Sequence, residues 1–240
     1  MKLYGKNPVL ERLKANPQSI HHILVEQGHE DHGYIATKAK KWGISVTAVP
    51  ASQIMKLARN HNTQGIIADI DDFVYTSYPE LLDKAVEKNM VLVFLDGVTD
   101  PQNLGAVLRS LGCLGGFAVI LPTHDSVSVT ETVLRVASGG DNYVTVAQVG
   151  NLAQAIKKAK DAGFWVIGSV VEDGENFFET KLQFPLGLVV GSEQKGIRDV
   201  IKKHLDHKVS VPMAQPRMSF NVAQATTLLA YEITKQKKQK

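Results

Sequence analysis

Short apolar runs alternate with helix-like segments from about residue 90 to the end of the chain. This alternation constrains the fold class more than any other feature of the sequence. The runs are apolar almost throughout, which is typical of parallel strands covered by helices on both faces. Strands separated by helices of this length predict a parallel α/β sheet, with ligands at the carboxyl ends of its strands. The five runs are residues 91–96, 117–122, 164–171, 186–191 and 207–213.

Residues 1–75 have a different sequence pattern, with shorter alternating segments and five of the eight histidines. We therefore predict a separate small α/β domain over residues 1–75. Residues 76–89 show no clear period and are predicted to form a linker, and residues 90–240 form the larger domain. In the first domain we expect helices at 9–15, 34–43 and 51–60, and strands at 21–27, 44–50 and 65–70.

Composition excludes several classes of protein. The chain is 44% hydrophobic and 21% charged, which excludes a wholly disordered protein. It lacks both the run of about 18 apolar residues that spans a bilayer and the apolar start of a secretory signal, so a cytoplasmic location is predicted. The single cysteine, Cys113, cannot form an internal disulfide. A formal charge of +3 is compatible with a polyanionic partner without establishing one.

The standard nucleotide and metal motifs are missing. No G-x-G-x-x-G follows a strand, and the loop GSEQKGIR lacks the Lys-Ser/Thr pair of a phosphate-binding P-loop. No group of histidines and cysteines has the spacing of a zinc site, so no metal is predicted.

Three loops that follow apolar strands have a specialised composition. In DGVTDPQNLGAVLRS, an Asp-Pro start places Asn103 in the first turn of a helix. In VVGSEQKGI, the lone carboxylate Glu193 lies between two glycines, which permit close approach of a ligand to the backbone. In VPMAQPRMSFNVAQAT, Ser219 or Asn221 can cap the last helix. Each loop alone also fits a capped helix or a solvated turn.

Taken together and in this order, the three loops resemble the conserved motifs of the SpoU (TrmH-type) RNA 2′-O-ribose methyltransferases of the SPOUT superfamily. The N-terminal segments YGKNPVLERL and NTQGIIA are similar to the RlmB-like branch, which modifies guanosine in large-subunit ribosomal RNA. The resemblance covers essentially the whole chain.

This resemblance implies an L30e-like RNA-binding domain at the N-terminus and a C-terminal trefoil knot that holds S-adenosylmethionine. It also implies a homodimer. Matching motif positions assign active-site roles to Asn103, Arg109, Glu193, Ser219 and Asn221, and donor contacts to Gly191, Val211 and Phe220. Gln194, Gln215 and Phe220 depart from the usual residues of the family, and the last two lie where adenosine would pack.

The reaction so implied is methyl transfer from S-adenosylmethionine to the ribose 2′-OH of a guanosine in 23S rRNA. Only RNA carries this hydroxyl, so a structured RNA is the expected partner and DNA is not. Arg109 would stabilise the developing alkoxide or bind a phosphate, because a guanidinium stays protonated. Glu193 would orient Arg109 or take the proton. A tRNA 2′-O-methyltransferase and a non-catalytic RNA-binding or ribosome-assembly protein stay open as alternatives.

Overall fold

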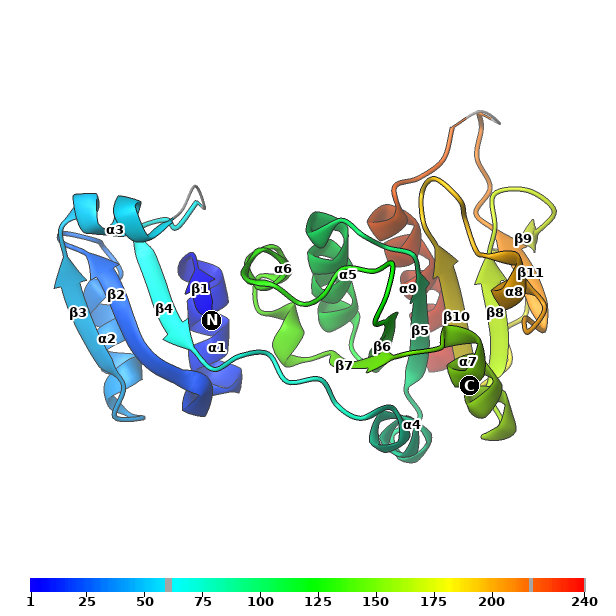
Figure 1. Ribbon diagram of the computed structural model, residues 1–240, viewed down its shortest axis with the longest axis horizontal. Helices are drawn as coiled ribbons and strands as arrows, with labels where there is room; N and C mark the ends of the chain where they lie inside the picture. Colours follow the sequence, from blue (N-terminus) through cyan, green and yellow to red (C-terminus); the bar gives the residue numbers. More distant parts are fainter. Residues whose placement is uncertain (59–61, 216–217, 240) are drawn as a thin grey trace.

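A computed structural model describes residues 1–58, 62–215 and 218–239 and contains two β-sheets that lie along its long axis (Figure 1). The first sheet has the strand order β1-β4-β2-β3. Only β2 and β3 run parallel, so this sheet is mixed. Its strands are β1 (Lys2–Tyr4), β2 (Ile20–Glu26), β3 (Ser45–Val49) and β4 (Ile66–Ile70), with helices α1 (Lys6–Ala15), α2 (His32–Lys40) and α3 (Ala51–Ala58).

The predicted elements of this domain are confirmed within a few residues at their ends, and β1 is an addition. Strand β1 has only three residues, too few to show a period in the sequence. The predicted helix at 51–60 is described as far as residue 58, and its last two residues lie outside the described part of the chain.

The second sheet is parallel throughout, as the sequence predicts, with the order β7-β6-β5-β10-β8-β11-β9. Every residue of β5 and β6 is buried, which accounts for their uninterrupted apolar sequences. The strands are β5 (Val91–Asp96), β6 (Phe117–Pro122), β7 (Thr145–Val149), β8 (Trp165–Ser169), β9 (Glu175–Asn176), β10 (Leu186–Gly191) and β11 (His207–Ser210).

Helices cover both faces of this sheet. Alternate residues of β5 pack in two clusters, Val91, Val93 and Leu95 in one and Leu92 and Phe94 in the other. The first face is covered by α5 (Pro101–Leu114) and α9 (Val222–Lys238), and α6 (Glu131–Ala137) packs on α5 and β1. The second face is covered by α4 (Tyr78–Glu87), α7 (Leu152–Asp161) and α8 (Asp199–Lys202). None of the described helices is long and apolar enough to cross a bilayer.

The predicted linker over residues 76–89 is wrong for most of its length, because it contains helix α4. Ser77 caps this helix by accepting a hydrogen bond from the backbone N of Glu80. Tyr78, Leu81 and Ala85 are buried against the large sheet, and the Tyr78 hydroxyl donates to the carbonyl of Ala155 at 2.6 Å. The extended connection between the two sheets instead covers residues 71–77.

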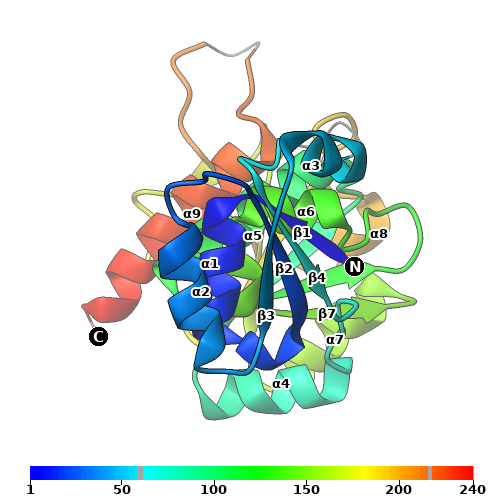
Figure 2. The same ribbon diagram turned by 90° about the vertical axis from the view of Figure 1, so that its left-hand side faces the viewer.

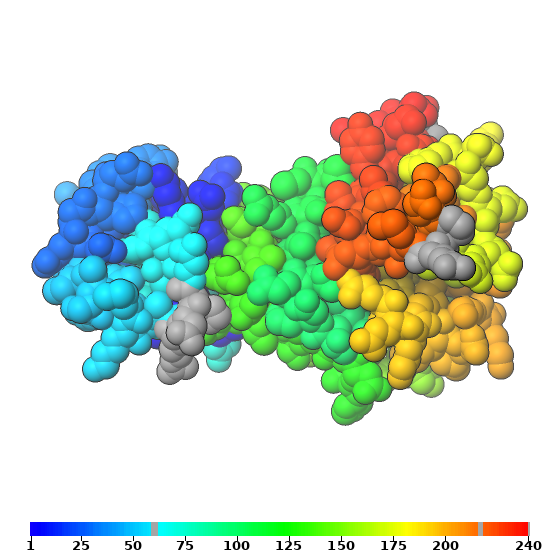
Figure 3. Space-filling view, turned by 90° about the horizontal axis from the view of Figure 1, so that it is seen from above, coloured from blue at the N-terminus to red at the C-terminus, as the bar shows by residue number. Residues whose placement is uncertain are grey.

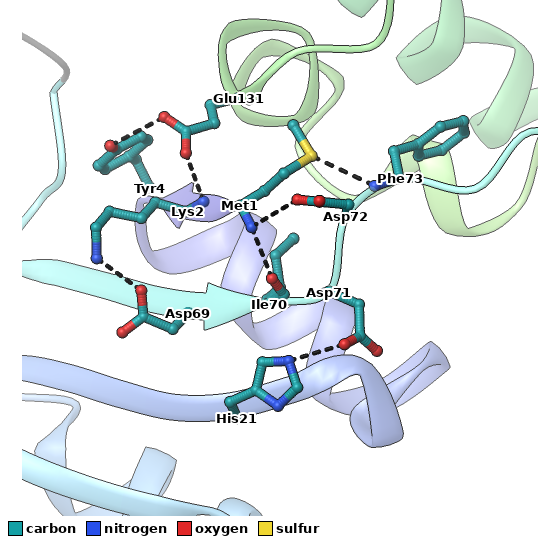
Figure 4. Close-up of polar contacts among 10 residues, drawn as sticks. All are labelled: Met1, Lys2, Tyr4, His21, Asp69, Ile70, Asp71, Asp72, Phe73 and Glu131. Carbon is teal, nitrogen blue, oxygen red and sulfur yellow. Dashed lines mark hydrogen bonds and ion pairs between the residues drawn. The ribbon is translucent and has the colours of Figure 1, made fainter.

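The N-terminal domain packs directly against the second domain (Figure 3), and it lies in front of that domain in the view of Figure 2. Glu131, in the first turn of α6, accepts hydrogen bonds from the backbone N of Lys2 at 2.6 Å and from the Tyr4 hydroxyl at 3.2 Å (Figure 4). Arg12 of α1 forms an ion pair with Asp141, which lies in the short 3₁₀-helix Gly140–Asn142; their side chains are 9% and 1% exposed.

Burial raises the pKa of Asp141, and the Arg12 guanidinium opposes this rise. The two domains therefore share a buried ionic contact as well as an apolar one.

Candidate functional site

The three loops singled out in the sequence meet at the carboxyl edge of the large sheet. Strands β5 and β10 are neighbours, and their last residues, Asp96 and Gly191, are paired in register. The loops that follow these two strands therefore start side by side. The third loop leaves β11 and returns as α9, which packs on α5 and β10.

Glu193 lies at the centre of this convergence. Its Oε1 accepts hydrogen bonds from Nδ2 of Asn103 at 3.1 Å, from Nδ2 of Asn221 at 2.5 Å and from the backbone N of Val222 at 3.3 Å. Asn221 also donates to Oδ1 of Asn103 at 2.8 Å. The structure thus brings together three of the five residues predicted for the active site, one from each loop.

Helix capping determines where the two asparagines point. Asp100 caps α5 by accepting from the backbone N of Gln102 at 2.8 Å, and Asn103 is consequently buried in the first turn. Asn221 caps α9 through its Oδ1, which accepts from the backbone N of Ala223 at 2.8 Å. Its amide NH₂ is then directed to Glu193. For Asn221, the capping role and the contact with Glu193 are therefore compatible.

A cavity of about 440 Å³ opens beside this cluster, within the size range of small-molecule sites. It is lined by all three predicted donor-contacting residues, Gly191, Val211 and Phe220, together with Ser219 and Glu193. A Cβ atom at position 191 would lie 2.1 Å from the carbonyl carbon of Gly196, so only glycine fits there. The lining combines apolar with polar side chains, a mixture that suits an S-adenosyl group.

Two lining residues were missed in the sequence. Glu172 and Asp173 lie in the loop after β8 and place carboxylates at the rim of the same cavity. Their position directly after an apolar strand run was the available signal. Conversely, Gln215 is exposed and does not line the cavity.

A second cavity, of about 360 Å³, lies on the other side of the loop that carries Glu193. Its walls include Asp100, Asn103 and Asp125, and it shares Glu193 and Val222 with the first cavity. The Glu193 carboxylate therefore borders two spaces, each large enough for part of a small molecule.

An ion pair between the buried Asp96 and the half-exposed Arg198 holds the end of the same loop, and the sequence did not point to it. Asp96 is fully buried at the end of β5; its Oδ1 accepts from Nε and Nη2 of Arg198 at 2.7 and 2.6 Å. Its Oδ2 accepts from the backbone N of Arg198 at 2.8 Å. These bonds fix the end of the loop at residues 192–198 to β5.

Arg109 is not part of the cluster within one chain. It follows Asn103 by six residues on α5, which places it about 120° around the helix and about 9 Å further along its axis. Its side chain is exposed and lines neither cavity. Among the described residues, no group of three or more His, Cys, Asp or Glu side chains could hold a metal ion.

Comparison with protein families identifies both parts of the chain. A sequence model of the SpoU rRNA Methylase family matches residues 90–231. A second model, described as RNA 2′-O ribose methyltransferase substrate binding, matches residues 2–76. Together the two matches cover almost all of the chain.

Curated relatives align along nearly the whole sequence. The RlmB 23S rRNA (guanosine-2′-O-)-methyltransferase of Pectobacterium atrosepticum is 32% identical and covers 98% of each chain. The putative TrmH family tRNA/rRNA methyltransferase YacO of Bacillus subtilis is 32% identical over 95% of this chain and 93% of its own. An uncharacterized tRNA/rRNA methyltransferase of Synechocystis is 34% identical over 98% of this chain, which spans 62% of that longer relative.

Solved structures share the fold. The SpoU methyltransferase AviRb of Streptomyces viridochromogenes, solved in complex with AdoMet, superposes with a TM-score of 0.81 at 20% identity over 99% of this chain and 90% of its own. An AdoMet-bound rRNA methyltransferase of Sinorhizobium meliloti gives 0.79 at 21% identity, over 98% and 86%. With both family matches, the three converging loops and a cavity that suits the donor, the chain belongs to the SpoU family of RNA 2′-O-ribose methyltransferases, which take their methyl group from S-adenosylmethionine.

Proposed function

We propose that this enzyme methylates the ribose 2′-OH of a guanosine in large-subunit ribosomal RNA, as in the RlmB-like branch. Full-length similarity to two proteins named 23S rRNA (guanosine-2′-O-)-methyltransferase, at 32% and 33% identity, supports this substrate. In the proposal residues 1–75 bind the RNA, and the domain that follows holds the donor and carries out the transfer.

The position of Glu193 between two cavities is the observation that carries the proposed mechanism. The donor occupies the cavity lined by Gly191, Val211 and Phe220, and the acceptor ribose enters the cavity lined by Asn103. Glu193 and Val222 border both cavities, so the acceptor hydroxyl and the donor methyl group would meet beside these two residues, where the hydroxyl oxygen, the methyl carbon and the sulfur would need to lie in line.

S-adenosylmethionine supplies an electrophilic methyl group on a sulfonium sulfur. The residues of this chain orient the acceptor and remove one proton. All three donors to Glu193 bond its Oε1, and no described residue hydrogen-bonds Oε2. In the proposal Oε2 accepts the proton of the ribose hydroxyl, while Asn103 and Asn221 hold the carboxylate without adding charge. Ser219 and Phe220 line the cavity that the proposal assigns to the donor.

We propose that Arg109 contacts RNA or the developing alkoxide. Because Arg109 lies away from Glu193 of its own chain, this role requires a second subunit. The exposed side of α5 carries Arg109 away from Glu193 of its own chain. A homodimer formed through the C-terminal domain brings this side to the site of the other copy. We also propose that the C-terminal part of this domain, which includes the segment from β11 to α9, forms a trefoil knot. Light scattering at low micromolar concentration tests the dimer, which has about twice the mass of one 26.2 kDa chain.

Transfer RNA is the second candidate substrate, because several relatives at 31–34% identity are named tRNA/rRNA methyltransferases. The decisive experiment maps 2′-O-methyl groups in ribosomal and transfer RNA from cells with and without the gene. Loss of a single guanosine methylation in 23S rRNA is expected. Loss confined to tRNA would replace the first candidate by the second.

Donor binding separates both candidates from a non-catalytic relative. Calorimetric titration with S-adenosylmethionine and its demethylated product is expected to show saturable binding to the purified chain. No saturation at millimolar ligand would contradict a catalytic role, and Phe220 would then be the first position to test.

A further inference from the structure

The outer side of helix α2 carries two large aromatic side chains that the fold does not use. Tyr34 is 54% exposed, and Trp42, in the turn that follows the helix, is 48% exposed. The opposite side of α2 packs on the sheet through Ile35 and Ala39, which are fully buried. The two rings therefore present apolar surface to solvent without contributing to the core.

Lysine side chains lie over both rings. The Nζ of Lys38 is 5.4 Å from the centroid of the Tyr34 ring, and the Nζ of Lys41 is 5.7 Å from that of Trp42. Both distances are within the range of a cation–π contact. Tyr34, Lys38 and Lys41 are four and three residues apart, so they share one face of the helix. We call Tyr34, Lys38, Lys41 and Trp42 the α2 stripe.

The charge of this surface is of one sign. Residues 32–43 contain no acidic residue and three lysines at positions 38, 40 and 41, all exposed. No ion pair joins any of the three to another described residue. By contrast, Lys2 and Lys6 of the same domain are paired with Asp69 and Asp31. The α2 stripe is thus an uncompensated cationic surface with two exposed rings, which complements a polyanion that has flat apolar groups.

We propose that the α2 stripe binds unpaired nucleotides of RNA, with bases stacked on Tyr34 and Trp42 and phosphates bound by the lysines. This inference rests on the proposed binding of substrate RNA by residues 1–75, and adds the surface and the recognition mode. Aromatic platforms bind single strands because every base has a face to stack, whereas a duplex hides those faces. Tyr34 and Trp42 are eight positions apart in the sequence, which corresponds to about 12 Å at the rise of an α-helix and is enough for about three stacked bases.

Tryptophan fluorescence reports directly on this surface. The chain has two tryptophans, and the other, Trp165, stacks on His207 in the second domain. A full-length Trp165→Phe variant therefore leaves Trp42 as the only tryptophan. We expect a ten-nucleotide single-stranded oligouridylate to quench its emission saturably. A blunt RNA duplex of equal length should change it far less. Binding of the oligouridylate, followed by anisotropy, without any change in Trp42 emission would overturn the proposal, and so would equal quenching by the duplex.

Substitutions separate stacking from charge. Trp42→Ala and Tyr34→Ala should each weaken oligouridylate binding about tenfold at every salt concentration, whereas Tyr34→Phe, which keeps the ring, should bind as the parent does. Lys38→Gln should instead reduce the slope of log affinity against log salt by about one. Phe178→Ala is the matched control, because Phe178 is 48% exposed in the second domain and none of the described lysines lies over its ring.

This test is independent of the proposed catalysis. If methyl transfer to RNA occurs but the alanine variants bind and react as the parent does, the α2 stripe is not the RNA surface and the proposed function stands. If oligouridylate binds at Trp42 but no RNA is methylated, the proposed substrate is wrong and the surface assignment stands. Binding of a protein, and not RNA, at this surface would overturn the inference.

Discussion

At the scale of single residues, the site depends on one carboxylate oxygen that three donors hold. Glu193, Asn103 and Asn221 come from loops far apart in the sequence. Each loop alone also fits a capped helix or a solvated turn, and the three residues were singled out only by the resemblance of the ordered loops to the SpoU motifs. Asp96 was not identified, because a carboxylate that ends an apolar run also fits a solvated turn. Its burial and its bonds to Arg198 depend on the neighbouring strand β10, which the sequence does not place.

Replacing Glu193 by glutamine tests its role as proton acceptor. The amide keeps the shape of the side chain but cannot accept the hydroxyl proton, so we expect methyl transfer to fall by about 10²-fold or more. Donor affinity should change only a few-fold, because Glu193 forms one part of the cavity wall. Single-turnover transfer and calorimetric donor titration measure the two effects. Unchanged turnover would remove Glu193 from the proposed mechanism.

Arg109→Ala separates RNA chemistry from donor binding. The side chain is exposed and lies outside both cavities, so its loss should leave the melting temperature and the donor affinity nearly unchanged. Methyl transfer should be abolished, because a fixed positive charge is lost from the acceptor side. Arg109→Lys is the companion variant, and it should retain part of the activity. Full turnover by the alanine variant would refute the proposed role.

At the scale of elements, the sequence predicts the parallel sheet well because its strands are apolar on both faces. Helix α4 was not predicted because its first three residues belong to the run DDFVYTSYPE, which shows no clear period. The Ser77 cap and Pro79 in the first turn were the available signals. Strand β9 has two residues and no detectable period. The order β5-β10-β8 joins strands that are distant in sequence, and no local pattern encodes that pairing.

Gly191→Ala tests the close packing at the end of β10. The added methyl group would lie 2.1 Å from the carbonyl carbon of Gly196, so the loop that carries Glu193 must shift. We expect loss of measurable donor binding and a lower free energy of unfolding, by about 1–3 kcal/mol. Gly150→Ala is the matched control, because a Cβ atom there has no neighbour within 4 Å. Wild-type donor affinity in Gly191→Ala would show that the loop tolerates displacement.

At the scale of the whole molecule, the two domains are held together by polar as well as apolar contacts. The side chains of Arg12 and Asp141 form a buried ion pair across the contact, and Glu131 accepts a hydrogen bond from β1. The extended segment of residues 71–77 therefore connects two domains that are already packed, and their relative orientation is part of the fold.

Arg12→Met should make the stability of the protein dependent on pH. Without the guanidinium, the pKa of Asp141 rises further above its unfolded value of about 3.9, so folding favours the neutral carboxyl. The stabilisation that comes from a neutral Asp141 is then fully present below about pH 3.9, and it is lost as the pH rises through the raised pKa of the folded state. We expect a deficit relative to the parent of about 3 kcal/mol at pH 8 and a smaller one at pH 5.

Urea unfolding at pH 5 and pH 8 measures this difference. Lys14→Met on the same helix is the control, because its side chain is 72% exposed. A deficit of equal size at both values would show that Asp141 does not change its protonation when Arg12 is lost.

The strand order of the large sheet has a consequence for synthesis on the ribosome. All four strands of the first sheet have been made by Ile70, so that domain can fold early. Strand β5 ends at Asp96, but its partner β10 begins only at Leu186. At the usual elongation rate of 5–20 residues per second, about 5–20 s pass before β10 has been made, and until then one edge of the apolar strand β5 stays unpaired. During that interval the nascent chain presents an unpaired strand of VLVFLD, a sequence suited to binding by chaperones.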